Sequence, residues 1–335
     1  MKAPSVSQKG DPFMRKDLLG IKDLSKEEII HLLQEAKKHK PKVMDKTLRD
    51  FNLKNTSLTT LFYENSTRTK MSFLLAAEYL GAYADDLNIS TSSVLKGESL
   101  VDTGMTIDAM GTNVIVIRHG MSGAAHLLAA NVKASVINGG DGANEHPTQA
   151  LLDMYTIWEK KGGFEGLNVT IVGDIANSRV ARSNIFGLVK MGAKVTLAGP
   201  STLLSGNMKA LGVERITSNV AEAIKDADVV MGLRIQLERQ KAVQFPSLPE
   251  YARFFGVSQE MLTHAKSDAL IMHPGPVNRG VEFSTDIIDG EQSVILEQVE
   301  NGVAMRMAVI EYLENARDVV IPQTTRRDNV IAMAQ

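Results

Sequence analysis

The sequence predicts an α/β protein of two domains, each a mostly parallel sheet with helices on both faces and with the active site in the cleft between the domains. The chain has 335 residues, which exceeds the usual size of one core and favours two domains of about 150 residues each. Eight short apolar runs alternate with helix-length segments, a pattern typical of parallel sheets covered by helices. Polar clusters follow these runs in both halves.

The elements are expected in a regular order along the chain. An amphipathic helix at 25–40 comes first, and eight strands follow with helices between them. The strands are expected at 56–63, 82–89, 113–119, 134–139, 168–174, 194–199, 228–234 and 269–274. A charged segment with three glycines, 158–166, marks the domain boundary. We expect one domain over 1–157, joined by a C-terminal helix at 302–320, and a second domain over 164–301.

The composition excludes several classes of function. Apolar residues make up 44% and charged residues 23% of the chain, as in ordinary globular proteins. The formal charge of −2 favours neither nucleic acid nor a membrane surface as a partner. The absence of cysteine rules out disulfides, thiolate metal sites and a cysteine nucleophile. No apolar run approaches the roughly 20 residues of a bilayer span, and no secretion signal is evident, so we expect a cytoplasmic location.

The polar clusters at the strand ends predict one binding site. Ligands of open α/β sheets bind beyond the carboxyl ends of the strands. Hydroxyl, arginine and histidine side chains stand at these positions in both halves of the chain. Two such clusters, one from each domain, indicate a single site in the cleft between the domains.

The segment 63–73, YENSTRTKMSF, is the richest of these clusters. The apolar pattern after it predicts a helix that stops at Gly81. Ser66 and Thr67 then stand at the helix N-terminus, where free N–H groups and the helix dipole favour an anion. Arg68 can bind a phosphate through two parallel hydrogen bonds. A simple Ser/Thr helix cap explains the local pattern equally well.

The sequence does not carry the usual nucleotide-binding fingerprints. It contains no G-x-x-x-x-G-K-[ST] motif, and no G-x-G-x-x-G follows the expected strand at 168–174. A nicotinamide or flavin enzyme is therefore disfavoured. We expect no cofactor and no metal.

Seven segments together carry a resemblance to a known family. They lie in order between about residues 15 and 320: FYENSTRTKMSF, KGESLVDT, VIRH, GDGANEHPTQALLD, GDIANSRVARSN, LRIQLER and MHPGPVNRGVE. The chain resembles the aspartate carbamoyltransferase family of pyrimidine biosynthesis. The resemblance implies carbamoyl phosphate and L-aspartate as substrates and a homotrimer with shared active sites. It also allows a regulatory chain or a dihydroorotase as a partner.

The resemblance assigns the first domain to carbamoyl phosphate. It implies that the phosphate is bound by Ser66, Thr67, Arg68 and Thr69, with Glu64 expected to orient an arginine of the cleft. Two residues of this family pattern differ here. Lys70 replaces an arginine and Leu74 replaces a glutamate, and neither position belongs to the phosphate-binding set.

The carbamoyl group has its own set of residues by the same resemblance. Arg118 contacts both the phosphate and the carbonyl, His146 donates to the carbamoyl oxygen, and Gln149 accepts from its NH₂ group. Backbone carbonyls of Gly275 and Pro276 also hold the amino group, and a cis bond is predicted before Pro276. The implied catalytic residues are Arg68, Thr69, Arg118 and His146. Taken alone, Arg118 also fits a surface arginine at a strand end, which is common, and a lone histidine such as His146 is more often a structural residue.

The second domain supplies the groups for aspartate. Arg179 and Arg234 each follow a predicted strand, and two arginines suit a dicarboxylate. The resemblance assigns both to the aspartate carboxylates, with Gln236 in support. It further implies that Lys96, which touches phosphate and aspartate, and Ser92, which touches phosphate, come from a neighbouring subunit. A surface charge or a salt bridge remains the alternative for each arginine.

Two other functions remain to be weighed. An ornithine or other amino-acid carbamoyltransferase shares the STRT half, but typically has HCLP where this chain has HPGP. A cationic acceptor would also fit poorly beside Arg179 and Arg234. A non-catalytic anion-binding relative would bind phosphate without turnover.

Overall fold

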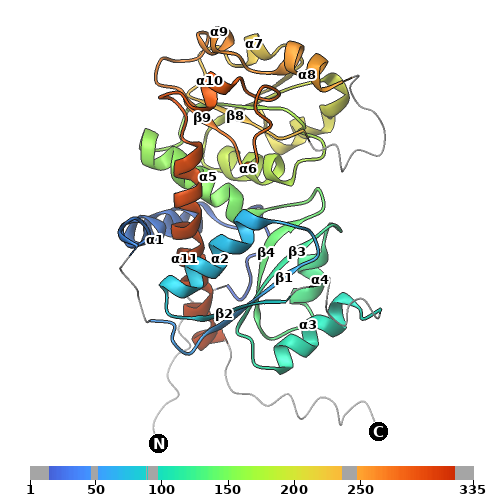
Figure 1. The fold of residues 1–335 in the computed structure, drawn as a ribbon, viewed down its shortest axis with the longest axis vertical. Helices are drawn as coiled ribbons and strands as arrows, with labels where there is room; N and C mark the ends of the chain where they lie inside the picture. Colours follow the sequence, from blue (N-terminus) through green and yellow to red (C-terminus); the bar gives the residue numbers. More distant parts are fainter. Residues whose placement is uncertain (1–14, 47–51, 88, 90–96, 236–246, 321–335) are drawn as a thin grey trace, which may run out of the picture.

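A computed structural model describes residues 15–46, 52–87, 89, 97–235 and 247–320. Figure 1 shows two lobes, each built around one sheet, with the long helix α11 (Ile295–Val320) running from the upper lobe along the lower one. The predicted fold class is confirmed, because both sheets are parallel and both are covered by helices. In the described part of the chain, no helix has the length and apolar character needed to cross a bilayer.

The lower lobe contains a four-stranded parallel sheet in the order β2-β1-β3-β4. Its strands are β1 (Ser57–Phe62), β2 (Tyr83–Leu87), β3 (Val114–His119) and β4 (Ser135–Asp141), and its helices are α2 (Thr67–Tyr79), α3 (Leu100–Ala109), α4 (Ala124–Ala129) and α5 (Pro147–Lys161). Alternate residues of β3 enter different cores. Val114 and Val116 pack with α1, α2, α5 and α11, whereas Ile115 and Ile117 pack toward α4. This alternation explains why the strand is apolar throughout.

The upper lobe contains a five-stranded parallel sheet in the order β7-β6-β5-β8-β9. Its strands are β5 (Asn168–Val172), β6 (Lys194–Ala198), β7 (Arg215–Thr217), β8 (Val229–Gly232) and β9 (Leu270–Met272). Its helices are α6 (Arg179–Lys190), α7 (Val220–Ala223), α8 (Leu248–Phe255), α9 (Gln259–Leu262) and α10 (Thr285–Ile288), with 3-10 turns η3 (Ser201–Leu203) and η4 (Gly206–Leu211). Sequence reasoning missed β7, because a three-residue edge strand is too short to show an alternating pattern.

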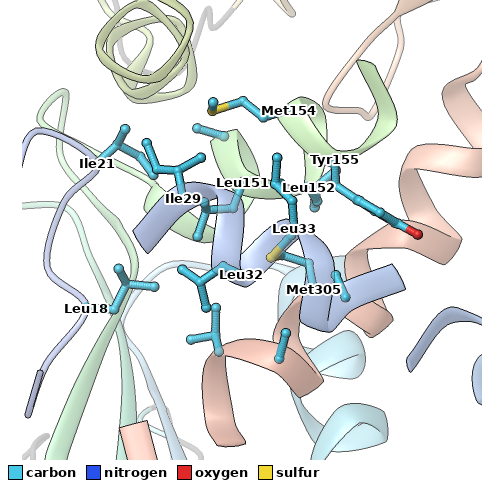
Figure 2. Close-up of a cluster of buried hydrophobic side chains, with 14 of the residues drawn as sticks. Leu18, Ile21, Ile29, Leu32, Leu33, Leu151, Leu152, Met154, Tyr155 and Met305 are labelled. Atoms are coloured by element: carbon cyan, nitrogen blue, oxygen red, sulfur yellow. The ribbon is translucent and has the colours of Figure 1, made fainter. Parts of the chain in front are cut away.

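Helices α1 (Lys26–Asp45) and α11 join α5 in the main core, which Figure 2 shows in close-up. Leu32 and Leu33 of α1, Leu151 of α5 and Met305 of α11 are each at most 1% exposed. Burying such a side chain stabilises the fold by about 1.5–3 kcal/mol. The packing of these three helices therefore ties the C-terminal segment to the first lobe.

Helix α11 begins at Ile295, two turns before the predicted start at 302. The glycine at 302 suggests a boundary in the sequence, but the structure places it inside the helix. A Cβ atom at Gly302 would lie 2.7 Å from Arg306 Nη1 and 3.2 Å from Leu152 Cδ2. Glycine is therefore needed for close packing between α11 and α5, and it does not end the helix.

Candidate active site

The carboxyl ends of strands from both sheets meet at a cavity of about 900 Å³ between the lobes. Of the fourteen residues predicted for the site, eleven line this cavity. They are Ser66, Thr67, Arg68, Thr69, Arg118, His146, Gln149, Arg179, Arg234, Gly275 and Pro276. The other three, Ser92, Lys96 and Gln236, lie outside the described residues. The geometry thus brings every described member of the set together, while their individual roles stay predictions.

The cavity wall carries a strong positive charge. Among the described residues that line it, the charged side chains are one glutamate, Glu64, and five arginines: Arg68, Arg118, Arg179, Arg234 and Arg306. Because the whole chain has a formal charge of −2, this concentration of cations is local. It favours a ligand, or a pair of ligands, with several negative charges.

The N-terminus of α2 opens into the cavity. Ser66 is the N-cap residue with extended backbone, and within the described part of the chain its side chain accepts no capping hydrogen bond. This observation argues against a simple helix cap at the STRT turn and favours an anion-binding site there. Thr69 is buried at 5% exposure. Burial and the nearby Arg234 cation lower the pKa of Arg68, which remains charged as arginines do.

Arg118 and His146 reach the cavity from the first lobe. Arg118 is the second-to-last residue of β3, and its Nη1 donates to the carbonyl oxygen of Gly139 at 3.2 Å, which directs the guanidinium across the strand ends. His146 is the N-cap of α5, followed by Pro147 at the first helical position. Its backbone N–H donates to Ser183 Oγ at 2.9 Å, so the cap of α5 is anchored on α6.

Arg179 links the two lobes. It is the first residue of α6, is only 3% exposed, and donates from Nη2 to Glu64 Oε2 at 2.6 Å. The same carboxylate oxygen lies 3.6 Å from Arg118 Nε. Glu64 follows β1, so the expectation that it orients an arginine of the cleft is confirmed. Arg234 follows β8, is half-buried and also lines the cavity.

The loop after β9 closes the cavity on the side of Arg68. The peptide bond between Gly275 and Pro276 is cis, as predicted. Gly275 has a φ of +63°, and a Cβ atom there would lie 3.0 Å from Arg68 Cζ. Glycine is therefore required both for the backbone conformation and for the approach of the guanidinium.

His273 holds this loop in shape. Its Nδ1 accepts a hydrogen bond from the N–H of Gly275 at 2.8 Å. Burial, and then the Arg68 and Arg234 cations, lower the pKa of His273 to about 3. The ring is therefore neutral at physiological pH, with its proton on Nε2. Sequence reasoning did not single out His273, although its place directly after a buried strand could have identified it.

Two further buried charges were missed. Asp153 is fully buried on α5 beside Gln149, and Arg306 lines the cavity from α11 at 3% exposure. Both lie within apolar helical patterns, where a charged residue is rarely buried without a function or a partner. Among the described residues, no group of three or more histidine, cysteine, aspartate or glutamate side chains is arranged to hold a metal ion.

Comparison with known proteins assigns the family. Residues 16–159 match the model for the aspartate/ornithine carbamoyltransferase carbamoyl-P binding domain, and residues 165–313 match that for the Asp/Orn binding domain. The chain belongs to the aspartate/ornithine carbamoyltransferase family. The resemblance inferred from the seven segments is confirmed.

Individual members of the family are similar over almost their whole length. The aspartate carbamoyltransferase catalytic subunit of Ruminiclostridium cellulolyticum is 60% identical over 305 residues, covering 91% of this chain and 97% of that protein. The catalytic subunit of the same name from Acetivibrio thermocellus is 61% identical over 303 residues, with coverage of 90% and 96%.

Solved structures of carbamoyltransferases share the fold. Ornithine carbamoyltransferase from Pyrococcus furiosus superimposes with a TM-score of 0.77 at 32% identity, covering 89% of this chain and 96% of that one. Aspartate transcarbamoylase from Trypanosoma cruzi, in complex with carbamoyl phosphate and aspartate, gives a TM-score of 0.79 at 28% identity, with coverage of 88% and 94%.

Proposed function

We propose that this chain transfers the carbamoyl group of carbamoyl phosphate to the amine of L-aspartate, giving N-carbamoyl-L-aspartate and phosphate. The observation that carries the proposal is the interlobe cavity, where five arginines and the N-terminus of α2 converge. Such a site suits a phosphate and a dicarboxylate bound side by side. The relatives named aspartate carbamoyltransferase catalytic subunits support this choice of acceptor.

The phosphate end of carbamoyl phosphate binds at the N-terminus of α2. The backbone N–H groups and the hydroxyls of Ser66, Thr67 and Thr69 donate to its oxygens, and Arg68 grips it through two parallel bonds. Domain roles follow from this placement. Residues 1–157 with 302–320 form the carbamoyl phosphate domain, and residues 164–301 form the aspartate domain.

Catalysis consists of positioning and charge stabilisation. The amine of aspartate attacks the carbamoyl carbon, the new C–N bond forms, and negative charge develops on the carbamoyl oxygen. Thr69, Arg118 and His146 donate to that oxygen, and losing one such donor typically lowers the rate by about 10²–10³-fold. The C–O bond to phosphate then breaks, and the departing phosphate accepts the proton that the amine loses.

Aspartate is recognised by charge. Arg179 and Arg234, supported by Gln236, bind its two carboxylates, and the α-amine is directed at the carbamoyl carbon. A cationic side chain such as that of ornithine would be repelled by the same two guanidinium groups. The site therefore selects aspartate over ornithine.

The assembly belongs to the proposal as well. We place Lys96 and Ser92 of a neighbouring copy in the site, which makes the active form a homotrimer with shared active sites. A regulatory chain or a dihydroorotase is a possible further partner. The pathway is pyrimidine biosynthesis, and the cytoplasmic location is a prediction from the sequence.

Transfer of a radiolabelled carbamoyl group tests the function. The purified protein should label aspartate and leave ornithine unlabelled. The variant Arg68→Ala should lose transfer by about 10³-fold while unfolding at the same temperature, because it removes the charge that grips the phosphate. Arg182→Ala is the matched control, since Arg182 is an exposed residue of the same charge on α6. Labelling of ornithine alone, or normal turnover by a folded Arg68→Ala variant, would contradict the proposal.

Shared sites are tested by mixing two inactive variants. Arg68→Ala and Lys96→Ala should each be inactive alone. When the two proteins are dissociated and reassembled together, some sites receive an intact Arg68 from one subunit and an intact Lys96 from another, so activity should return. Hybrid trimers that form but stay inactive would exclude the sharing.

A further inference from the structure

Asp153 is a fully buried carboxylate at the junction of three helices, and the mechanism above does not use it. It is 0% exposed on α5, and its neighbours in the chain, Leu151, Leu152, Met154 and Tyr155, form part of the apolar core in Figure 2. A charge in such a place is costly unless hydrogen bonds compensate for the lost water.

Three side-chain amides surround the carboxylate. Gln149 Nε2 of α5 donates to Oδ1 at 2.9 Å, and Gln298 Nε2 of α11 donates to the same oxygen at 2.7 Å. Asn184 Nδ2 of α6 donates to Oδ2 at 2.8 Å. Asp153 therefore bonds to side chains from both lobes and from the helix that runs between them.

The chemistry of a carboxylate dictates how these amides point. An ionised carboxylate only accepts hydrogen bonds, so each amide must turn its NH₂ group toward Asp153. The contacts of Gln298 fit this orientation, because its Oε1 accepts from the backbone N–H of His273 at 2.9 Å. Gln149 is oriented in the same way, which directs its Oε1 away from Asp153 while the residue lines the cavity. The cavity thus receives an acceptor from Gln149.

The same network reaches the loop after β9. Gln298 anchors the N–H of His273, and the His273 ring in turn accepts from the N–H of Gly275. A continuous series of hydrogen bonds therefore runs from Gln149 through Asp153, Gln298 and His273 to Gly275. Its two ends are the two groups expected to hold the carbamoyl NH₂.

We propose that Asp153 is a positioning residue that sets both sides of the pocket for the carbamoyl NH₂ group: it presents the carbonyl oxygen of Gln149 and, through Gln298, holds the 273–276 loop. The inference rests on the proposed function, because it assigns the NH₂ group of carbamoyl phosphate as the ligand. Asp153 does not touch the substrate, and it acts through Gln149 and the loop.

Asp153 is ionised above a pH of about 6, in spite of its burial. Burial raises the pKa of Asp153 to about 6, against the lowering effect of the three amides and of the Arg306 cation. Arg306 is the charged group from α11, lying over the Phe73 ring at 5.0 Å with Nη1 donating to the Gly302 carbonyl oxygen. The groups that bond to Asp153 from α5, α6 and α11 are the neutral amides described above. At pH 8 Asp153 is therefore an acceptor.

Two substitutions change the acceptor in steps. Asp153→Asn keeps the shape but replaces one acceptor oxygen by an NH₂ group, which faces Gln149 and Gln298 at the Oδ1 position or Asn184 at the Oδ2 position. Asp153→Leu removes both acceptors. We expect kcat/KM for carbamoyl phosphate to fall about tenfold in the first variant and about 100-fold in the second, the size typical of a misplaced binding group. If Asp153→Leu does not fold, the kcat/KM of Asp153→Asn alone tests the proposal.

A double-mutant cycle separates positioning from general stability. Because Gln149 is one of the two routes by which Asp153 acts, Asp153→Asn should lower kcat/KM by only about threefold, not tenfold, when Gln149 is already alanine. The matched control is Thr156→Val on the same helix. It removes a buried hydrogen bond from Asn301 Nδ2 at 2.9 Å that also joins α5 to α11. This control should lower the unfolding temperature without changing kcat/KM for carbamoyl phosphate.

The outcomes are distinguishable. Any one of three results would overturn the positioning role. They are a wild-type kcat/KM in Asp153→Asn, a full tenfold loss that persists when Gln149 is alanine, and an equal loss of activity in Thr156→Val. These results would leave the proposed function intact as long as the wild-type protein carbamoylates aspartate. Failure of the wild-type protein to do so would instead refute the proposed function.

Discussion

The stability of the protein should depend on the protonation of Asp153, and Asp153→Asn should remove that dependence. Burial raises the pKa of Asp153 from 3.8 to about 6 in the folded protein. The folded state therefore binds this proton more tightly than the unfolded chain does. The resulting stabilisation is complete below a pH of about 4 and is lost as the pH rises through about 6.

The magnitude follows from these two pKa values. Between pH 8 and pH 5 the linkage relation gives the wild-type protein about 1 to 2 kcal/mol of added stability from this one group. The neutral asparagine has no such contribution. For a cooperative unit the size of one lobe, a stabilisation of this size corresponds to about 3 to 6 °C in unfolding temperature.

The assay is thermal unfolding of both proteins at pH 5 and pH 8, at one protein concentration. At each pH, the unfolding temperature of the wild type is subtracted from that of Asp153→Asn. This difference should be about 3 to 6 °C larger at pH 8 than at pH 5. For Thr156→Val the same comparison should show no pH dependence. A difference for Asp153→Asn that is equal at both pH values, or smaller at pH 8, would refute the reasoning. The expected result means that at pH 8 the fold gives up stability to keep a charged acceptor.

Two further predictions concern groups that line the cavity. Gly275→Ala should raise KM for carbamoyl phosphate about tenfold, because a Cβ atom 3.0 Å from Arg68 Cζ displaces the guanidinium. Gly280→Ala, also at positive φ but with no atom within 4 Å of its Cβ among the described residues, should leave KM unchanged. Glu64→Gln should raise KM for aspartate about tenfold, because it replaces the charge-assisted bond that orients Arg179 at 2.6 Å. Steady-state kinetics with each substrate varied checks both predictions. An unchanged KM for carbamoyl phosphate in Gly275→Ala, or for aspartate in Glu64→Gln, would contradict the corresponding prediction.

Much of the fold could be predicted because local chemistry repeats along the chain. Buried parallel strands need apolar residues on both faces, so strands such as β3 and β8 are visible as apolar runs. All eight predicted strands are present, including the partly exposed edge strand β2. The prediction failed where tertiary packing overrides the local pattern. The edge strand β7 is too short to leave a signal, and Gly302 resembles a helix boundary although it serves the contact with Leu152.

The candidate site was likewise predictable in part. Arg118 lies near the end of β3, Arg234 lies just after β8, and Arg68 lies in the first turn of the helix that follows β1. Strand direction alone places them at one edge. Asp153 gave no comparable signal, because a charge inside a helical pattern usually indicates a solvent-facing position. Its importance depends on Asn184 and Gln298, which stand 31 and 145 residues away in the chain.

The sequence by itself determined the fold class, the family and the residues that converge on the cleft. These follow from the order of apolar runs and from short motifs, each of which is local in the chain. Only the tertiary structure decided that Glu64 pairs with Arg179, that the Ser66 hydroxyl does not cap α2, and how the Gln149 amide is oriented. Hydrogen bonds and ion pairs between distant segments depend on distances of a few tenths of an ångström, and packing alone sets those distances.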